Sequence, residues 1–285
     1  MGRSGFLILL VLFFSLTLLE ISKDGLSNYS SLLEAQEEKE ILDFNIASYT
    51  KEGRSWELKG RSADIFEDTV KLKDLEANFY ETEKITLTSK EGTFDRRNNL
   101  IHLEKDVKLV TETGLNLETD SLNYDVTQKM MRSLDSVNIQ RENLSLKGNS
   151  LEAKPDLRLA EIKKDIVLEI ERPNPEERKI QITCDGPLEI NYEERVAVFT
   201  NNVKVETAEG EIASDTMEVY FDILETKDIG SWKIDRIKAI GNVRITREKN
   251  ISFSQEAVYL TKEKKITLIG KPKLVIYSEE GISLP

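Results

Sequence analysis

The sequence of 285 residues predicts an all-β protein made of antiparallel strands. Short runs alternate apolar and polar side chains, as in Ile85-Thr-Leu87 and Val107-Lys-Leu109, and a period of two gives each strand one apolar and one polar face. Turn-forming residues recur between the runs. The runs are too short for a parallel sheet crossed over by helices, and helical patterns are absent after residue 41.

The expected strands follow one another from residue 41 onward. Within 85–124, turns are expected at Glu91-Gly92, 97–99, 104–106 and Thr113-Gly114, because Gly, Asn and Asp accept turn conformations. Two prolines in the charged segment 171–178 exclude a central strand and mark a module boundary or a long loop. A second extended loop is expected at 222–232. The expected strand segments are 44–50, 55–66, 70–80, several within 85–124, 137–140, 144–148, 157–162, 166–171, several within 179–221, 238–246 and several within 256–277.

One strand pattern recurs at intervals of about 30 to 40 residues. A quasi-period of this length, with no helix inside it, predicts stacked strand pairs and a sheet that grows along one axis. The pattern, an aliphatic residue followed by a polar one and a second aliphatic one, occurs at Val70, Val107, Val137, Val203 and Val243, and similar runs with valine in the middle begin at Ile166 and Leu274.

Residues 1–21 are expected to form a membrane anchor or a secretion signal. Sixteen uncharged, mostly apolar residues lie between Arg3 and Glu20, which is short for a spanning helix and also fits a signal. No small-x-small cleavage motif follows, and this favours one retained N-terminal transmembrane helix over a cleaved signal. Because the only positive charges before this segment are Arg3 and the amino terminus, the rest of the chain is expected to be exported. Residues 22–40 are expected to be a polar tether.

Composition and motifs argue against nucleic-acid binding and against catalysis. The formal net charge of −12 disfavours a phosphate-backbone partner. The single cysteine, Cys184, alternates with Ile180 and Ile182 and is expected to be a buried apolar side chain, while the single histidine, His102, is expected on the polar face of its strand. Phosphate-binding glycine loops, dinucleotide motifs and C-x-x-C pairs are absent from the sequence. We therefore expect no catalytic residue, no cofactor and no metal.

The apolar strand faces are the remaining candidate for function. A sheet of many strands buries one face by folding into a sandwich or by curling into a trough. In an incompletely closed trough the lining would form an apolar channel suited to acyl chains, because each CH₂ removed from water contributes roughly 0.8 kcal/mol. The residues expected to line such a groove are Ile65, Leu72, Phe79, Leu87, Phe94, Val107, Leu109, Leu117, Tyr124, Val137, Ile139, Val203, Val205, Val219, Val243 and Ile245.

Both halves of the chain resemble lipopolysaccharide-transport proteins. Residues 1 to about 170 are similar to the LptC family: an N-terminal apolar segment is followed by Trp56-Glu-Leu-Lys, Ala77-Asn-Phe-Tyr80, 85–95, Asp106-Val-Lys-Leu109 and 114–124. Residues 180–278 resemble the LptA/OstA-type module. The matching segments there are 199–205, Ala213-Ser-Asp215, Val219-Tyr220, 239–245 and 266–272. One departure is Asn201, where the usual dipeptide Gly-Asn would place glycine.

The resemblance implies a twisted, elongated antiparallel β-jellyroll of two stacked modules. Its interior would shield the acyl chains of lipid A, and its modules would join other proteins by edge-strand pairing. The implied order is an anchor at 1–21, a tether at 22–40, an LptC-like jellyroll at 41–170, a linker at 171–179 and an LptA/OstA-like jellyroll at 180–285.

The resemblance also implies a role, partners and a location. The chain would be a non-enzymatic inner-membrane protein with its bulk in the periplasm of a Gram-negative bacterium. It would accept lipopolysaccharide from an inner-membrane ABC transporter and pass it to an LptA-like protein or an outer-membrane LptD-like protein. A structural β-solenoid or surface interaction protein without lipid cargo is the alternative, and a carbohydrate-active β-helix enzyme is a third possibility.

Overall fold

The computed structural model describes residues 39–50, 53–80, 84–154, 157–171, 179–223 and 232–277. These residues form seventeen strands of antiparallel sheet and no α-helix, so the all-β prediction is confirmed. A helix long and apolar enough to cross a membrane is not found within these ranges. The expected anchor at 1–21, most of the expected tether and the proline-rich segment at 172–178 lie outside the described residues.

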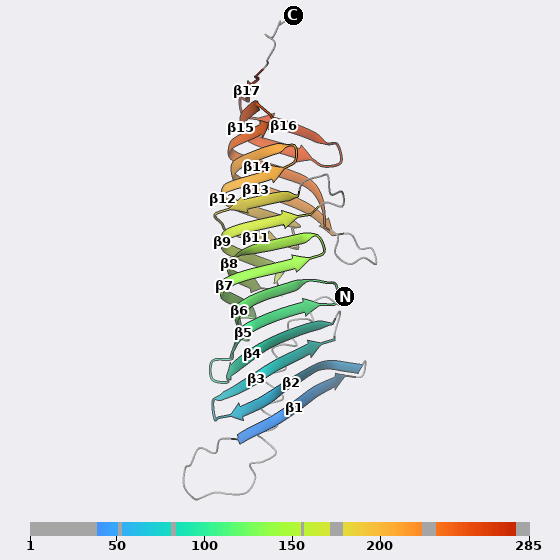
Figure 1. Ribbon diagram of the computed structural model, residues 1–285, viewed down its shortest axis with the longest axis vertical. Helices are drawn as coiled ribbons and strands as arrows, with labels where there is room; N and C mark the ends of the chain where they lie inside the picture. Colours follow the sequence, from blue (N-terminus) through green and yellow to red (C-terminus); the bar gives the residue numbers. More distant parts are fainter. Residues whose placement is uncertain are drawn as a thin grey trace, which may run out of the picture. The chain divides into compact units, whose positions relative to one another are not determined.

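The chain divides into two compact units. The first comprises residues 1–139 and 150–158, and the second comprises residues 140–149 and 159–285. Within each unit, most successive strands lie side by side in sequence order, as Figure 1 shows; β10 and β11 instead follow one another between β9 and β12, and β16 and β17 both pair with β15. The strands are β1 (Lys39–Thr50), β2 (Gly53–Ile65), β3 (Thr69–Phe79), β4 (Ile85–Asp95), β5 (Leu100–Thr111), β6 (Asn116–Asp125), β7 (Met130–Arg141), β8 (Leu144–Lys154), β9 (Leu159–Ile170), β10 (Ile180–Cys184), β11 (Leu188–Asn191), β12 (Val196–Thr207), β13 (Gly210–Ile223), β14 (Trp232–Arg247), β15 (Asn250–Leu260), β16 (Lys265–Ile269) and β17 (Lys273–Val275).

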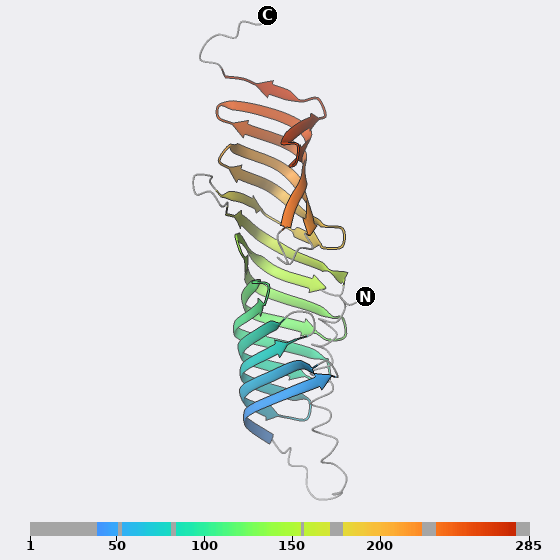
Figure 2. The ribbon, with the colours of Figure 1, turned by 90° about the vertical axis from the view of Figure 1, so that its right-hand side faces the viewer.

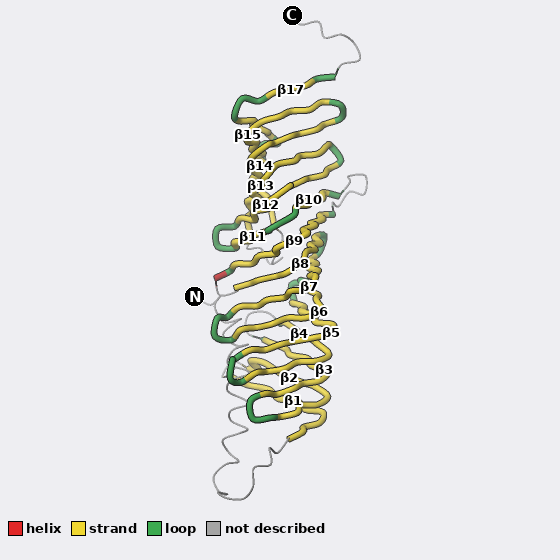
Figure 3. Tube along the Cα trace, turned by 90° about the vertical axis from the view of Figure 1, so that its left-hand side faces the viewer, coloured by secondary structure: helices red, strands yellow, loops and turns green. Residues whose placement is uncertain are grey.

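Several hairpins share one turn chemistry. The Asp95 carboxylate accepts the backbone N–H of Asn98 at 3.0 Å, and the Asp125 carboxylate accepts that of Gln128 at 2.8 Å. The last residue of each turn, Asn99 or Lys129, has a positive φ of 53° or 51°. An Asp side chain can bond the backbone of its own turn, and this closes the hairpin locally. The turns expected at 97–99 and 113–114 are confirmed, and such short turns stand at the strand ends in Figure 3.

Two of the expected turns are instead bends inside long strands. β4 continues through Glu91-Gly92, and β5 continues through 104–106. Lys105 and Asp106 have φ values of 64° and 56°, and the pairing of β5 shifts its register at this point. A bulge of this kind bends a strand without ending it. The prediction of short strands was therefore wrong here, because residues that accept a positive φ serve a bulge as well as a turn.

These bends account for the recurring sequence pattern. In each case a residue with positive φ stands immediately before a buried aliphatic side chain. Three predicted members of the pattern do not fit. Val70 lies at the start of β3, whose bend is followed by Leu75, and Leu274 in the last strand is 64% exposed. Val137 is buried, but the residue before it does not have a positive φ. The bend pairs are Asp74 and Leu75, Asp106 and Val107, Asp165 and Ile166, Asn202 and Val203, and Asn242 and Val243.

Buried hydroxyl groups accompany the bends on the intervening strands. The hydroxyl of Ser89 donates to the carbonyl of Glu91 at 3.0 Å, and Ser214 donates to Thr216 at 3.0 Å. Thr119 makes the same bond to Ser121 at 3.3 Å and also lies 2.8 Å from the hydroxyl of Ser133. Because a buried polar group is costly without a partner, these bonds let a polar residue lie at the bend of an otherwise apolar interior.

Candidate functional site

The first half of the candidate site is one wall of apolar side chains in the first unit. Side chains at paired positions of neighbouring strands point to the same face, so the register defines rows across the sheet. One row joins Trp56, Phe79 and Ile85 across β2, β3 and β4. The next row, which lies closer to the bend, joins Leu58, Ala77, Leu87, Leu109 and Leu117 across β2 to β6.

The other halves of the same strands form a second wall beyond the bend. One row joins Ile65, Val70, Phe94, Ile101 and Tyr124. Another row joins Ala63, Leu72, Gly92, Leu103 and Leu122. Both walls belong to a single cluster of buried apolar residues.

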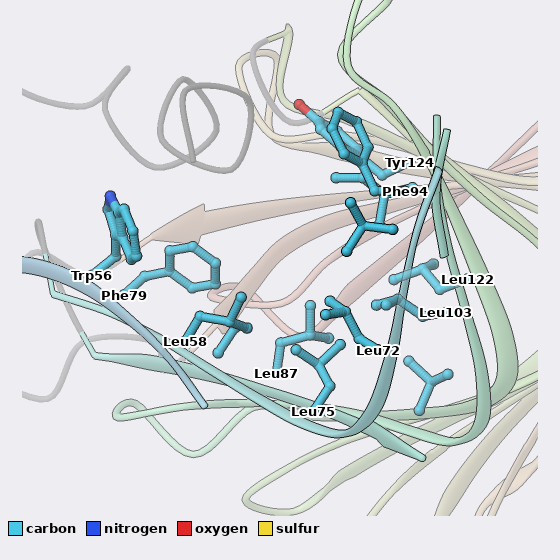
Figure 4. Packing of buried hydrophobic residues seen from close by; sticks show 14 of the residues in the cluster. Trp56, Leu58, Leu72, Leu75, Phe79, Leu87, Phe94, Leu103, Leu122 and Tyr124 are labelled. Carbon is cyan, nitrogen blue, oxygen red and sulfur yellow. The ribbon is translucent and has the colours of Figure 1, made fainter. Parts of the chain in front are cut away.

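The bent strands hold this cluster between their two halves. In Figure 4, Trp56 and Phe79 lie on one side, Phe94 and Tyr124 lie on the other, and Leu87, Leu75 and Leu72 lie between them. Aromatic side chains therefore stand far from the bend, and aliphatic ones stand near it. We call the space between the two walls the trough and the line of bends its bottom; the buried cluster fills it.

The second unit repeats this construction. Figure 2 shows its bent strands from the side, and the same kind of row crosses them. The lining is more aliphatic, and Tyr192 meets Phe221 edge to face with their ring centroids 6.3 Å apart. The rows of the second unit join Leu188, Phe199, Met217, Ala239 and Ala257; Ile182, Val205, Ile212 and Ile245; and Ile190, Ala197, Val219, Ile237 and Tyr259.

The opposite face of the strands is polar and charged. Lys108 pairs with Glu118 at 3.0 Å, and Lys105 pairs with Glu91 at 2.6 Å. The hydrogen bond from Lys108 lowers the pKa of Glu118, and the hydrogen bond to Glu91 raises the pKa of Lys105. Exposed pairs of this kind contribute little to stability, typically below about 1 kcal/mol. They keep the outer face soluble, so the apolar face is the candidate site.

The sixteen predicted lining residues all lie on strands and face the interior, but at different depths. Four valines at the bottom are fully buried, three of them directly after a bend residue with positive φ, and those on the walls are mostly buried. Four are only half-buried. The bottom residues are Val107, Val137, Val203 and Val243; the buried wall residues are Leu72, Phe79, Leu87, Phe94, Leu117, Tyr124, Val205 and Val219; the half-buried ones are Ile65, Leu109, Ile139 and Ile245.

Several residues of the same rows were not predicted. For some of them the signal was present in the sequence. Trp56, Ile101 and Ile182 pair with the predicted Phe79, Phe94 and Val205, and Leu122 and Met217 stand two positions from the predicted Tyr124 and Val219. The lining residues were missed because each bend changes which of the alternating residues face the interior, and the sequence did not show where the bends lie. The missed lining residues are Trp56, Leu58, Ile101, Leu103, Leu122, Ile162, Ile166, Ile182, Leu188, Phe199 and Met217.

Cys184 and His102 were considered as chemically reactive residues, and the surroundings of both fit a structural role. Cys184 is buried, as predicted, and its burial raises the pKa of its thiol. His102 lies half-buried on the polar face, where Nδ1 is 2.7 Å from the side-chain oxygen of Asn123 and Nε2 contacts the Glu104 carboxylate. Groups of three or more His, Cys, Asp or Glu side chains able to hold a metal are not found in the described part of the chain.

Family comparison also divides the chain into two parts, but at a different place from the compact units. Residues 6–171 match the family described as lipopolysaccharide-assembly, LptC-related. The chain belongs to this LptC-related family. Residues 181–282 match a second family, described as LptA/(LptD N-terminal domain) LPS transport protein. The LptC-related chain thus carries a C-terminal LptA-like module, as its sequence predicted, and it is a lipopolysaccharide-transport protein by family. No curated protein sequence matches it.

Proposed function

We propose that this LptC-related chain is a non-enzymatic lipid carrier anchored in the inner membrane with its bulk in the periplasm. It accepts lipopolysaccharide from an inner-membrane ABC transporter and passes it along the apolar trough toward the outer membrane. The observation that supports this proposal is the set of aligned apolar rows on the inner face of the strands, such as Leu87, Leu109 and Leu117. These rows lie in a chain that matches two lipopolysaccharide-transport families.

The trough binds acyl chains by burial rather than by directional contacts. Each CH₂ group that leaves water contributes roughly 0.8 kcal/mol, so a few acyl chains can be held without hydrogen bonds. A carrier must also release its cargo, and a binding surface without directional contacts allows a chain to slide from one row to the next. Half-buried wall residues such as Leu109, Ile65 and Ile245 are the proposed contact points.

The residues at the bottom of the trough have a different role in this proposal. Val107, Val137 and Val243 are at most 1% exposed, so their side chains already pack against the protein. A ligand would have to displace that packing, which is as dense as an organic crystal. We assign these valines to the fold and the half-buried wall positions to the lipid.

Photocrosslinking in cells tests this division. A photoreactive residue at Leu109 is expected to form an adduct with lipopolysaccharide, while the same residue at the outward-facing Lys108 is the matched control and is expected to form none. Equal yields at Leu109 and Lys108, or no adduct at any of Leu109, Ile65 and Ile245, would sink the proposed lipid path.

A charged substitution supplies the functional test. Leu109→Arg places a cation at a half-buried wall position and is expected to abolish lipid adducts formed from Ile65, with the strand content of the protein unchanged. Lys108→Glu, on the opposite face, is the control. Phe79 is less suitable, because it is 3% exposed and a charge there would disrupt packing. If Lys108→Glu abolished the lipid adducts to the same extent, the loss caused by Leu109→Arg would not arise in the trough.

The alternative is a structural protein whose repeats only build length. It predicts an interior that stays fully packed and carries no cargo. Native mass spectrometry of gently extracted protein separates the two functions: the carrier retains lipid, and the structural protein does not.

The partners follow from the free ends of the sheet. Among the described residues β1 pairs only with β2, and β16 and β17 pair only with β15. Ile266, Ile269 and Leu274 on the last strands are exposed. We propose that this last edge pairs with an LptA-like or LptD-like protein, since unpaired backbone groups template a further strand. A photocrosslinker at Leu274 is expected to capture that protein, and one at the outward-facing Lys204 is not.

A further inference from the structure

A cation continues one of the apolar lines of the trough. Val137 and Ile139 of β7 face the interior, and because side chains alternate along a strand, the last residue of β7, Arg141, faces the same way. Residues 138–141 all have a negative φ, so no further bend changes this alternation. Arg141 is half-buried, and its Nε atom is buried. The side chain therefore lies against the protein and does not extend straight into water.

Arg141 stands at the rim of one wall, the rim being the end of a wall farthest from the bends. In the turn that follows, the amide of Asn143 donates to the carbonyl of Glu171 at 2.7 Å, and the N–H of Glu171 donates to the carbonyl of Asn143 at 2.8 Å. Glu171 follows Ile170, which pairs with Ile180 at the start of β10. Arg141 thus ends the wall that the last part of β9 and β10 continue.

Tyr192 stands at the rim of the opposite wall. It follows β11, which pairs with β9 before the bend at Asp165, whereas β10 pairs with β9 beyond that bend. Leu188 and Ile190 of β11 are 1% and 8% exposed and face the interior, and Tyr192 continues their alternation. Its ring contacts the buried Phe221 edge to face, with 6.3 Å between the ring centroids. This contact holds the phenol on the inner side of the rim.

Arg141 and Tyr192 face each other across the trough. Burial raises the pKa of the Tyr192 phenol, and the positive charge of Arg141 lowers it. A single charge has such an effect only at short range, because water and salt screen interactions over longer distances. Both residues belong to the second unit. A guanidinium and a phenol therefore lie together at the mouth of an apolar trough.

This arrangement suits a phosphate group attached to acyl chains. A guanidinium donates two parallel hydrogen bonds to phosphate oxygens, and a phenol O–H can donate another. Leu144 and Ile170, on the same wall as Arg141, are half-buried and offer apolar surface next to the guanidinium. The chain as a whole has a formal net charge of −12, which repels anions. An anionic ligand is therefore attracted only where a cation such as Arg141 faces it.

We propose that Arg141, with Tyr192 as a second donor, binds the phosphate of an anionic lipid whose acyl chains lie along the adjoining apolar wall. The acyl chains still bind by burial alone, and the phosphate fixes the point along the trough at which the lipid pauses. The site thus selects phosphorylated lipids over other apolar chains. This inference rests on the proposed function, since it assigns a place to one part of the proposed cargo.

Two lipids that differ only in phosphate test the site. The full chain in detergent carries a photoreactive residue at Ile170 and is irradiated with limiting amounts of phosphorylated lipid A, or of the same lipid A after phosphatase treatment. The protein with Arg141 intact is expected to form about tenfold more adduct with the phosphorylated lipid, because hydrogen bonds between charged groups are the strong ones. Equal yields with the two lipids would overturn the proposal.

Matched substitutions assign the preference to Arg141. Arg141→Gln is expected to abolish it, and Arg141→Lys to keep part of it, because an ammonium group cannot form the two parallel bonds. Arg132→Gln is the control, since Arg132 is an exposed arginine of the same strand and pairs with Glu152 at 3.3 Å. A substitution that only loosens the fold lowers both yields and leaves their ratio unchanged. An unchanged ratio in Arg141→Gln, or an equal loss in Arg132→Gln, contradicts the site.

Tyr192→Phe tests the second donor. The variant keeps the ring that contacts Phe221 and removes only the O–H, so a smaller loss of the preference is expected than with Arg141→Gln. A preference as large as that of the parent protein would overturn the part assigned to Tyr192.

Competition separates a lipid phosphate from free phosphate. Inorganic phosphate at the concentration of the lipid is expected not to reduce the adduct, because it lacks the acyl chains that supply the rest of the affinity. Competition on equal terms would assign Arg141 to free phosphate and overturn the lipid as its ligand.

Failure of the site and failure of the carrier give different results. Adducts that form equally with both lipids refute the site and leave the carrier standing. A preference that depends on Arg141 in detergent, with no lipopolysaccharide adduct in cells, leaves the anion site standing and refutes the carrier.

Discussion

The side-chain amide of Asn242 on β14 donates a hydrogen bond to the carboxylate of Asp215 on β13, with 2.9 Å between Nδ2 and Oδ2. The same relationship joins Asn202 to Asp185 at 2.5 Å and Asn149 to Asp165 at 2.8 Å. In each pair at least one partner stands at a bend with a positive φ or beside one. The bends are thus tied to the neighbouring strand on their outer side.

Substitution of Asn242 separates the contribution of its hydrogen bond to stability from that of its positive φ. Asn242→Val loses the hydrogen bond and places a β-branched side chain at a φ of 45°, so we expect a loss of about 2 kcal/mol in the free energy of unfolding. Asn242→Gly loses only the hydrogen bond, and about 1 kcal/mol is expected. Urea unfolding measures both. Equal losses would show that the positive φ contributes nothing.

The buried hydroxyl of Thr119 is expected to stabilise the bend of β6. Thr119→Val keeps the shape but removes the contacts with Ser133 at 2.8 Å and with the Ser121 carbonyl at 3.3 Å. Because Ser133 is itself buried, a loss of about 1–2 kcal/mol is expected. Thr127→Val in the exposed turn is the control, with an expected change within about 0.5 kcal/mol. If Thr119→Val left the free energy of unfolding unchanged, the hydrogen bonds of the Thr119 hydroxyl would not be needed for the bend.

Gly148 allows β8 to lie close to β9. An added Cβ would stand 2.4 Å from Cγ2 of the fully buried Ile162 and 3.1 Å from the backbone oxygen of Lys164. Gly148→Ala is therefore expected to destabilise by about 1–3 kcal/mol, as overpacking does. Gly92→Ala is the milder comparison, since its nearest neighbour is the end of the Leu103 side chain at 3.2 Å. Thermal unfolding ranks the two variants, and the reverse order would contradict the packing account.

Glu169 makes part of the stability depend on pH. The hydrogen bond from Lys179, followed by the one from Gln181, lowers the pKa of Glu169 below its usual value of 4.5. A folded-state pKa below the unfolded value stabilises the protein above the unfolded pKa, and this is lost as the pH falls through the folded pKa. Glu169→Gln is thus expected to be less stable than the parent protein at pH 7, with the gap closing below about pH 4.5. The exposed Glu189→Gln should show no such gap, and a gap at Glu169 that does not narrow as the pH falls below 4.5 would rule out the ion pair as its cause.

Cys184 is expected to react slowly with thiol reagents in the folded protein. Burial raises the pKa of its thiol, and only the thiolate is nucleophilic. Reaction with a disulfide reagent at pH 8 should become fast only in denaturant. A Ser136→Cys, Cys184→Ala variant carries the thiol at an exposed position and is the control. Equal rates in the two native proteins would show that Cys184 is accessible.

Alternation made the strands predictable, but the bends were misread as turns. The residues around Lys105 and Asp106 satisfy the same local rules in a hairpin turn and in a bulge, since both accept a positive φ. The difference lies in whether the strands on either side continue to pair with the same neighbours, and that is a long-range relationship. The recurrence at Val107, Val203 and Val243 was visible in the sequence, whereas its meaning as the bottom of a trough was not.

The boundary between the modules was likewise indicated only in part by the sequence. The charged proline-rich segment pointed to a break near 171–179, and the family matches end and begin on either side of it. The compact units of the structure divide elsewhere, within β7 and β8 and between Arg158 and Leu159. Pairing of β9 with β10 across the break accounts for the difference, because backbone ladders follow space and not sequence families. The module limits expected from the sequence stay a prediction.

By itself, the sequence determined the all-β class, the apolar side of most strands, the burial of Cys184 and the resemblance to two lipopolysaccharide-transport families. These depend on local alternation and on motif order, which are properties of the chain. Only the tertiary structure decided where each strand bends, which rows align across strands and which lining residues are half-buried. Leu109 and Val107 stand two residues apart on one strand, yet Leu109 is half-buried and Val107 is fully buried. The packing of both walls around the bend creates that difference.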